Sequence, residues 1–262
     1  MSVSRPFPSA ARPLGGLPSP ILIGIGAAWV AAIAAEATGS AAGLHHDSLL
    51  VGGPGFGPAL LLFLLAWQVM IAAMMLPSSL PLVRMYAAAT VGTPERSRSM
   101  AAFVGGYALV WSAFGALAFV FDAAIHATVN ASPWVEAHDW AIGPSVLLLA
   151  GAFQFSSLKD ACLKACRHPA SFLRRHYRRG PAGGLMLGAR HGMFCVGCCW
   201  ALMLVMFAAG AANLIWMAAL TGLMVHEKTR PAGARTVPLT GVVLLAAGST
   251  LLLWAAYANG AI

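Results

Sequence analysis

The sequence predicts an all-α fold, a polytopic bundle of about seven transmembrane helices. Of the 262 residues, 59% are hydrophobic and only 9% are charged, whereas a soluble globular domain carries about 25% charged residues. The mean hydropathy of the chain is +0.77. The apolar residues also gather into runs long enough to cross a membrane, separated by short polar segments. These observations exclude a soluble globular protein.

The chain divides into a short tail and one membrane domain. Residues 1–20 are rich in Pro, Ser and Gly and are predicted to be a disordered cytoplasmic tail, while residues 21–262 form a single transmembrane domain. The run 21–35 is interpreted as an uncleaved first helix, because a long tail precedes it and many spans follow; a signal peptide is the alternative. The predicted spans are about 21–35, 56–76, 100–121, 141–158, 191–209, 213–225 and 237–257.

The second span contains the first group of soft side chains. Met70 and Met74 are one helical turn apart on one face. Gln68 carries an amide that needs a partner inside a bilayer. Pro77 and Pro81 are expected to end or kink this helix and to free backbone carbonyls. Under the alternative interpretation, the methionines face lipid and the prolines simply end the span.

The later spans are bounded by features typical of a membrane interface. Trp134 and Trp140 precede the fourth span and suit the boundary between membrane and water. The fourth span leads into a basic cytoplasmic loop, residues 159–190, which is expected to contact anionic lipid. The sixth span is short for a hydrocarbon layer of about 30 Å. A five-span alternative, which omits the hairpin of spans five and six, therefore stays open.

The positive charges predict the orientation of the bundle. All 16 Lys and Arg residues lie in alternate segments between the spans, and the opposite segments contain none. By the positive-inside rule, the amino terminus is predicted to be cytoplasmic and the carboxyl terminus to be outside. This topology explains the net charge of +8. Aromatic residues are not interleaved with the basic ones, so the expected partner is the lipid bilayer and not a nucleic acid.

The five cysteines are confined to residues 162–199. An odd number rules out complete disulfide pairing within the chain, and the predicted topology places them in or near the cytoplasmic half, where thiols stay reduced. Cys162 and Cys166 are four residues apart and would project from one face of a helix that Pro169 stops. The thiols are therefore predicted to be free and available as ligands.

The stretch 191–206 concentrates soft ligands at the start of the fifth span. At about 100° per residue, a helix places His191, Cys195 and Cys199 on one face. Thiolate and thioether ligands select Cu(I) and, to a lesser degree, zinc. The competing interpretation is that Cys and Met serve here as ordinary apolar packing. The candidate metal ligands of this stretch are His191, Cys195, Cys198, Cys199, Met203 and Met206.

The order of these ligands predicts a path for copper. Cys162 and Cys166 would receive or release Cu(I) at the cytoplasmic surface, and the cysteines of the fifth span would hold it at the membrane entrance. The candidate methionines of the second and fifth spans would then pass it inward through weaker thioether bonds. Glu227 is expected to form an ion pair with Lys228 or with Lys159, or only to anchor a helix end.

Four segments carry a resemblance to a known family: WQVMIAAMMLPSSLP, FQFSSLKDACLKACRHP, GMFCVGCCWALMLVMFAAGAANLIWMAAL and HEK. They resemble a family of predicted metal-binding integral membrane proteins of bacteria, once a domain of unknown function, that is similar to a membrane copper chaperone associated with bacterial polyphenol oxidase. The resemblance runs from about residue 60 to residue 228. It implies copper handling with delivery to extracytoplasmic or membrane copper enzymes. The residues it carries over are Met70, Met74, Met75, Gln154, Lys159, Cys162, Cys166, Cys195, Cys198, Cys199, Trp200, Met203 and Glu227.

The favoured function is a copper(I) chaperone or insertion factor that performs no catalysis. Its expected partners are a copper-enzyme client and a copper-donor protein. Two alternatives use the same residues: a metal-ion transporter or channel, and a membrane assembly subunit in which Cys and Met are packing. A thiol-redox enzyme is a further alternative. Cys195 and Cys198 have the redox spacing for it, but they lie in an apolar helix without a thioredoxin-like βαβ setting.

Overall fold

The computed structural model describes residues 19–43, 46–50, 53–209 and 213–260. The predicted cytoplasmic tail lies almost entirely outside the described residues. Every regular element within these ranges is a helix, so the all-α prediction is confirmed. The long helices are α1 (Ser19–Ala37), α4 (Phe56–Ala89), α5 (Arg96–Ala131), α10 (Gly180–Ala209) and α12 (Gly233–Ala258). The shorter ones are α2 (Ser40–Gly43), α3 (His46–Leu50), α6 (Pro133–Glu136), the 3₁₀ turn η1 (Asp139–Ala141), α7 (Ile142–Phe153), α8 (Ser157–Arg167), α9 (Pro169–His176) and α11 (Leu214–Thr229).

The structure supports fewer complete spans than the seven predicted. Among the described residues, five helices are long and apolar enough to cross a membrane. A sixth span results if Asp139–Phe153 and α8 count as one, although they are bent by 65° where they meet. The predicted sixth span corresponds to α11, which has only 16 residues and is short for the hydrocarbon layer.

The outer faces of the long helices expose large apolar side chains. Leu117 and Phe121 of α5 are each 70% exposed, and Trp254 of α12 is 69% exposed. Many exposed large apolar side chains are a liability in water, whereas they suit contact with lipid chains. The length and the surface of these helices are therefore those of a membrane protein.

The prolines of α4 do not end it. The helix continues past Pro77 and Pro81 to Ala89, so the expected boundary near residue 76 is wrong. Because proline has no N–H, Pro77 leaves the carbonyl of Ala73 without its helical donor. The indole N–H of Trp29 in α1 donates to that carbonyl at 3.0 Å. The freed carbonyl thus attaches α1 to α4.

Glycines allow α10 to pack directly on α5. Gly184 and Gly188 face the backbone carbonyls of Ser99 and Phe103, and a Cβ atom at either glycine would overlap the carbonyl oxygen. Small residues at a spacing of four let two helices approach closely within a membrane. Helix α10 begins at Gly180, well before the boundary expected at residue 191, so these glycines belong to its first turns.

The segment predicted as a basic loop, residues 159–190, is largely helical. It contains most of α8, all of α9 and the first turns of α10. As predicted, α8 ends before Pro169, which then serves as the first residue of α9. In α9, Phe172 and Leu173 are buried while Arg174 and Arg175 are exposed. Arg174 and Arg175 therefore lie on the outer face of an amphipathic helix, whereas Arg178 and Arg179 lie in the short non-helical connection between α9 and α10.

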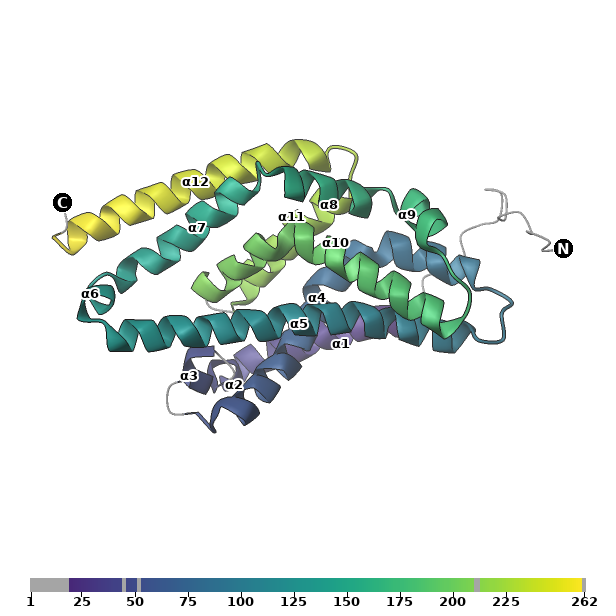
Figure 1. Ribbon diagram of the computed structural model, residues 1–262, viewed down its shortest axis with the longest axis horizontal. Coiled ribbons are helices and arrows are strands. Elements are labelled where there is room, and N and C mark those ends of the chain that lie inside the picture. Colours follow the sequence, from purple (N-terminus) through teal and green to yellow (C-terminus); the bar gives the residue numbers. More distant parts are fainter. Residues whose placement is uncertain (1–18, 44–45, 51–52, 210–212, 261–262) are drawn as a thin grey trace.

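The centre of the molecule is formed by α10 and α11. Figure 1 shows these two helices between α5 on one side and the paired α7 and α12 on the other. Helix α4 also packs on α11, and α8 packs on α10. Every cysteine and most methionines of the candidate site lie on α4, α8, α10 and α11, so the fold gathers them in one place.

Candidate metal centre

The cysteines of α10 are buried in the interior of the bundle. Cys195 is 0% exposed, and Cys198 and Cys199 are each 1% exposed. The thiol of Cys199 donates to the backbone carbonyl of Cys195 at 2.9 Å, and that of Cys198 donates to the same carbonyl at 3.1 Å. All are free cysteines. The helical periodicity therefore places these sulfur atoms together, as the sequence predicts.

Helix α8 brings the other two cysteines to the same place. The side chains of Cys166 and Cys198 lie close enough to interact electrostatically. Cys162 packs so closely on Gly197 of α10 that a Cβ atom there would lie 2.6 Å from the Cys162 sulfur. The two cysteine groups are thus one cluster, and its partly exposed member is Cys166.

A bend in the chain and a buried ion pair hold α8 in this position. The chain turns by 65° between α7 and α8, and Ser156 caps α8 by accepting a hydrogen bond from the backbone N–H of Lys159 at 3.1 Å. Lys159 Nζ lies 2.8 Å from Glu227 Oε2 of α11, with side chains 1% and 3% exposed. Arg167 also donates to the backbone carbonyl of Glu227. Of the two predicted partners of Glu227, the structure therefore selects Lys159.

Lys228 instead points its ammonium group at the cysteines. Its Nζ lies 3.1 Å from Cys195 Sγ and 3.9 Å from Cys199 Sγ, and it donates to Ser78 Oγ at 3.2 Å. The residue is only 6% exposed, and no salt bridge to a carboxylate is found for it in the described part of the chain. Buried charges are normally paired. The groups positioned to supply negative charge here are the thiols, which must lose their protons to bind a metal.

His191 joins the cluster through two hydroxyl groups. Its Nε2 is 3.0 Å from Ser79 Oγ, which lies 3.4 Å from the hydroxyl of Tyr107. That hydroxyl is in turn 3.1 Å from Cys195 Sγ. The imidazole stacks on the Tyr107 ring with centroids 5.7 Å apart. The structure therefore places His191 at the edge of the cluster, where it is hydrogen-bonded to Ser79 and connects to Cys195 through the two hydroxyl groups.

The candidate methionines lie in the interior and do not face lipid. Met75 Sδ is 3.8 Å from Cys199 Sγ, which makes it the first thioether beyond the cysteines. The other methionines of this core belong to α4, α10 and α11. They are Met70, Met74, Met203, Met206, Met217 and Met224, each at most 7% exposed and in one apolar core with the cysteines. By contrast, Met193 is 63% exposed.

Several contacts at the site are not predicted by spacing. The position of Lys228 beside Glu227 drew attention to this lysine, but it favoured an ion pair between the two and not a contact with cysteines. Met75 had a signal as the neighbour of Met74, because the resemblance includes both. Nothing in the sequence predicts the contacts of Tyr107 and Ser78, since a hydroxyl group in an apolar helix does not indicate which thiol or ammonium group it will contact.

The donor set fits copper better than zinc. No group of three or more His, Cys, Asp or Glu side chains is arranged to hold a metal ion among the described residues. A structural zinc site uses four such ligands in a tetrahedron, so the zinc expectation gains no support. Pairs of thiols with a nearby thioether are instead the soft donors that select Cu(I).

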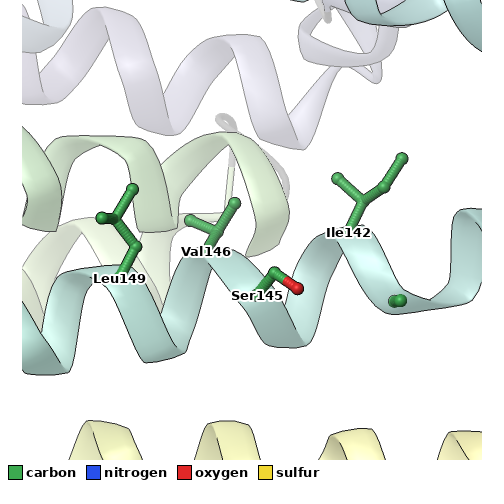
Figure 2. Close-up of a pocket in the computed structure, with 5 residues that line it drawn as sticks. Ile142, Ser145, Val146 and Leu149 are labelled. Atoms are coloured by element: carbon green, nitrogen blue, oxygen red, sulfur yellow. The ribbon is translucent and has the colours of Figure 1, made fainter.

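A separate apolar pocket lies along α7. Figure 2 shows Ile142, Val146 and Leu149 projecting from one face of that helix. The pocket has a volume of about 310 Å³, and its lining contains no Cys, Met or charged side chain. It is therefore distinct from the candidate metal centre.

Comparison with known families agrees with the chemistry of the cluster. The family model PpoB2, described as copper chaperone, matches residues 64–251. This chain belongs to the PpoB2 copper chaperone family. The match covers well over half of the chain and contains every candidate ligand, so the resemblance found in the sequence is confirmed. No curated protein and no solved structure shows a significant match to this PpoB2 family member.

Proposed function

We propose that this PpoB2 family member is a membrane-embedded Cu(I) chaperone whose cargo is held by the cysteines of α8 and α10. The observation that carries the proposal is a continuous set of sulfur atoms. It begins at the partly exposed Cys166, which interacts with Cys198. Cys198 and Cys199 both donate to the carbonyl of Cys195, and Cys199 Sγ lies 3.8 Å from Met75 Sδ. Soft donors in contact with one another suit a soft ion that moves by ligand exchange.

Cu(I) would be received at Cys166 and Cys198. Metal binding replaces the thiol protons, and the positive charge of Lys228 lies beside the next sulfur atoms, Cys195 and Cys199. The copper would therefore be held most tightly at the buried thiolates. Departure from them is assisted by Met75, because its thioether is already 3.8 Å from Cys199 Sγ.

Beyond Met75 the proposed path follows the buried methionines. These side chains come from α4, α10 and α11, which meet in the centre of the bundle. A thioether is a neutral ligand and binds Cu(I) more weakly than a negatively charged thiolate does. This region would therefore pass copper on without retaining it. The proposed outcome is delivery to a copper enzyme on the outer side of a bacterial cytoplasmic membrane, with no catalytic turnover by the chaperone.

The direct test is the copper content of the protein purified in detergent and loaded anaerobically with Cu(I). We expect the wild type to retain stoichiometric copper after desalting. The triple variant Cys195→Ser, Cys198→Ser, Cys199→Ser is expected to lose it, because a hydroxyl is a hard and weakly coordinating group. Copper measured by mass spectrometry, relative to protein, gives the result.

Met193→Leu is the matched control, since Met193 lies on the same helix but is 63% exposed. It should retain copper like the wild type. Helix content by circular dichroism and elution volume should be equal in all proteins, which separates loss of ligands from loss of fold. If the triple variant retains as much copper as the wild type, or neither binds copper, the cysteines are packing and the proposal is wrong.

A further inference from the structure

The charge balance at Lys228 leads to an inference about metal selectivity. Lys228 is 6% exposed and its ammonium contacts Cys195, Cys199 and Ser78. We infer that Lys228 makes the Cys195–Cys199 site selective for a soft monovalent cation over a divalent one. This inference rests on the proposed function, because it requires the cysteines to hold the metal.

The ammonium group is fixed beside the thiols by Ser78. The hydroxyl of Ser78 donates its own proton to the backbone carbonyl of Met75 at 2.8 Å, so its oxygen lone pairs are left to accept from Lys228 Nζ at 3.2 Å. The lysine can thus stay in place when a metal binds between Cys199 and Met75, whose sulfur atoms lie 3.8 Å apart. Lys228 would then act as a permanent charge of the site and not as a ligand.

Besides Lys228, the buried Lys, Arg, Asp and Glu side chains among the described residues are Lys159 and Glu227, and their charges cancel. Lys159 and Glu227 form a buried ion pair at 2.8 Å and contribute no net charge. Two thiolates, the lysine and one monovalent cation therefore sum to zero. A divalent cation in the same place would leave one uncompensated positive charge, and net charge is costly to bury in protein or lipid.

Removal of the lysine charge should reverse which cation, monovalent or divalent, makes the site neutral. In Lys228→Met, two thiolates and a divalent cation are neutral, while two thiolates and Cu(I) carry a net negative charge. We expect the ratio of the Ag(I) or Cu(I) affinity to the Zn(II) affinity to fall at least about tenfold in Lys228→Met, because selectivity is a difference between two affinities. Lys228→Arg keeps the charge and should restore the wild-type ratio.

The experiment uses the full-length reduced protein in detergent. Ag(I), which does not change oxidation state, and Zn(II) are titrated separately against chelators of known affinity, and the two dissociation constants are compared. Lys228→Gln is the second neutral variant and retains a hydrogen-bond donor for Ser78. Lys164→Met is the matched control, since Lys164 lies on the exposed face of α8, and its ratio should equal that of the wild type.

Each outcome decides one of two questions. If the wild type binds neither Ag(I) nor Cu(I), the proposed function itself fails. If the wild type binds the monovalent ions but the neutral variants keep its affinity ratio, the inference is overturned and the chaperone proposal stands. Should both neutral variants fail to fold, the wild type alone decides, because Zn(II) binding at the cysteines as tight as Ag(I) binding contradicts selection by Lys228.

Discussion

Replacement of Glu227 by Ala is expected to lower the free energy of unfolding by about 3–5 kcal/mol, because it leaves the buried ammonium of Lys159 without its partner. The two charged groups lie 2.8 Å apart and their side chains are 1% and 3% exposed. Loss of this ion pair also releases α8 from α11, so part of the cysteine cluster should separate. The free energy is measured by reversible denaturation in mixed micelles.

The matched control is the exposed ion pair on α8 itself. Lys164 and Asp160 lie 2.6 Å apart with side chains 68% and 63% exposed, so Asp160→Ala should change the stability by no more than about 1 kcal/mol. The double variant Lys159→Met, Glu227→Leu should recover most of the loss, because an apolar pair needs no charge compensation. Equal effects of Glu227→Ala and Asp160→Ala would contradict this account of α8.

Gly188→Ala is expected to destabilise the protein by about 1–3 kcal/mol, toward the upper end, because overpacking against backbone cannot be relieved by a side-chain rotation. A Cβ atom at Gly188 would overlap the carbonyl oxygen of Phe103. The only relief is to separate α10 from α5, which would also move the cysteines that α10 carries. The same unfolding measurement checks the result.

Gly105→Ala provides the comparison on the facing helix. Nothing lies within 4 Å of a Cβ atom at Gly105, so this change should be neutral or should stabilise the helix by roughly 0.5–1 kcal/mol, since Gly disfavours helix interiors. If Gly188→Ala is as well tolerated as Gly105→Ala, the close packing of α5 on α10 is wrong.

Local periodicity explains which parts of the site could be predicted. Residues four apart on a helix share a face whatever the rest of the chain does, so Cys195 and Cys199 could be placed together from the sequence. The same rule applies to Met70 and Met74. Hydropathy likewise predicted where the long helices lie, since burial in lipid needs a long apolar run.

Contacts between distant elements could not be predicted in this way. The meeting of Cys166 with Cys198 depends on the 65° bend between α7 and α8, and no residue pattern specifies that angle. The choice of Lys159 over Lys228 as the partner of Glu227 has the same cause, because it is decided by where α8 crosses α11.

Two errors came from reading breaker residues as boundaries. Pro77 was expected to interrupt its helix, but Trp29 satisfies the carbonyl that the proline frees, so α4 continues. Gly188 lies in a segment predicted as loop, yet its missing side chain is what allows α10 to pack on α5. In a membrane, neighbouring helices compensate for residues that end helices in water.

The most direct measurement of the central claim is X-ray absorption at the copper edge on the Cu(I)-loaded wild type. The account predicts a first shell made of sulfur atoms at thiolate and thioether distances, since the proposed ligands are Cys195, Cys199 and Met75. A first shell dominated by nitrogen or oxygen would contradict it, and would instead place the copper away from the cysteine cluster.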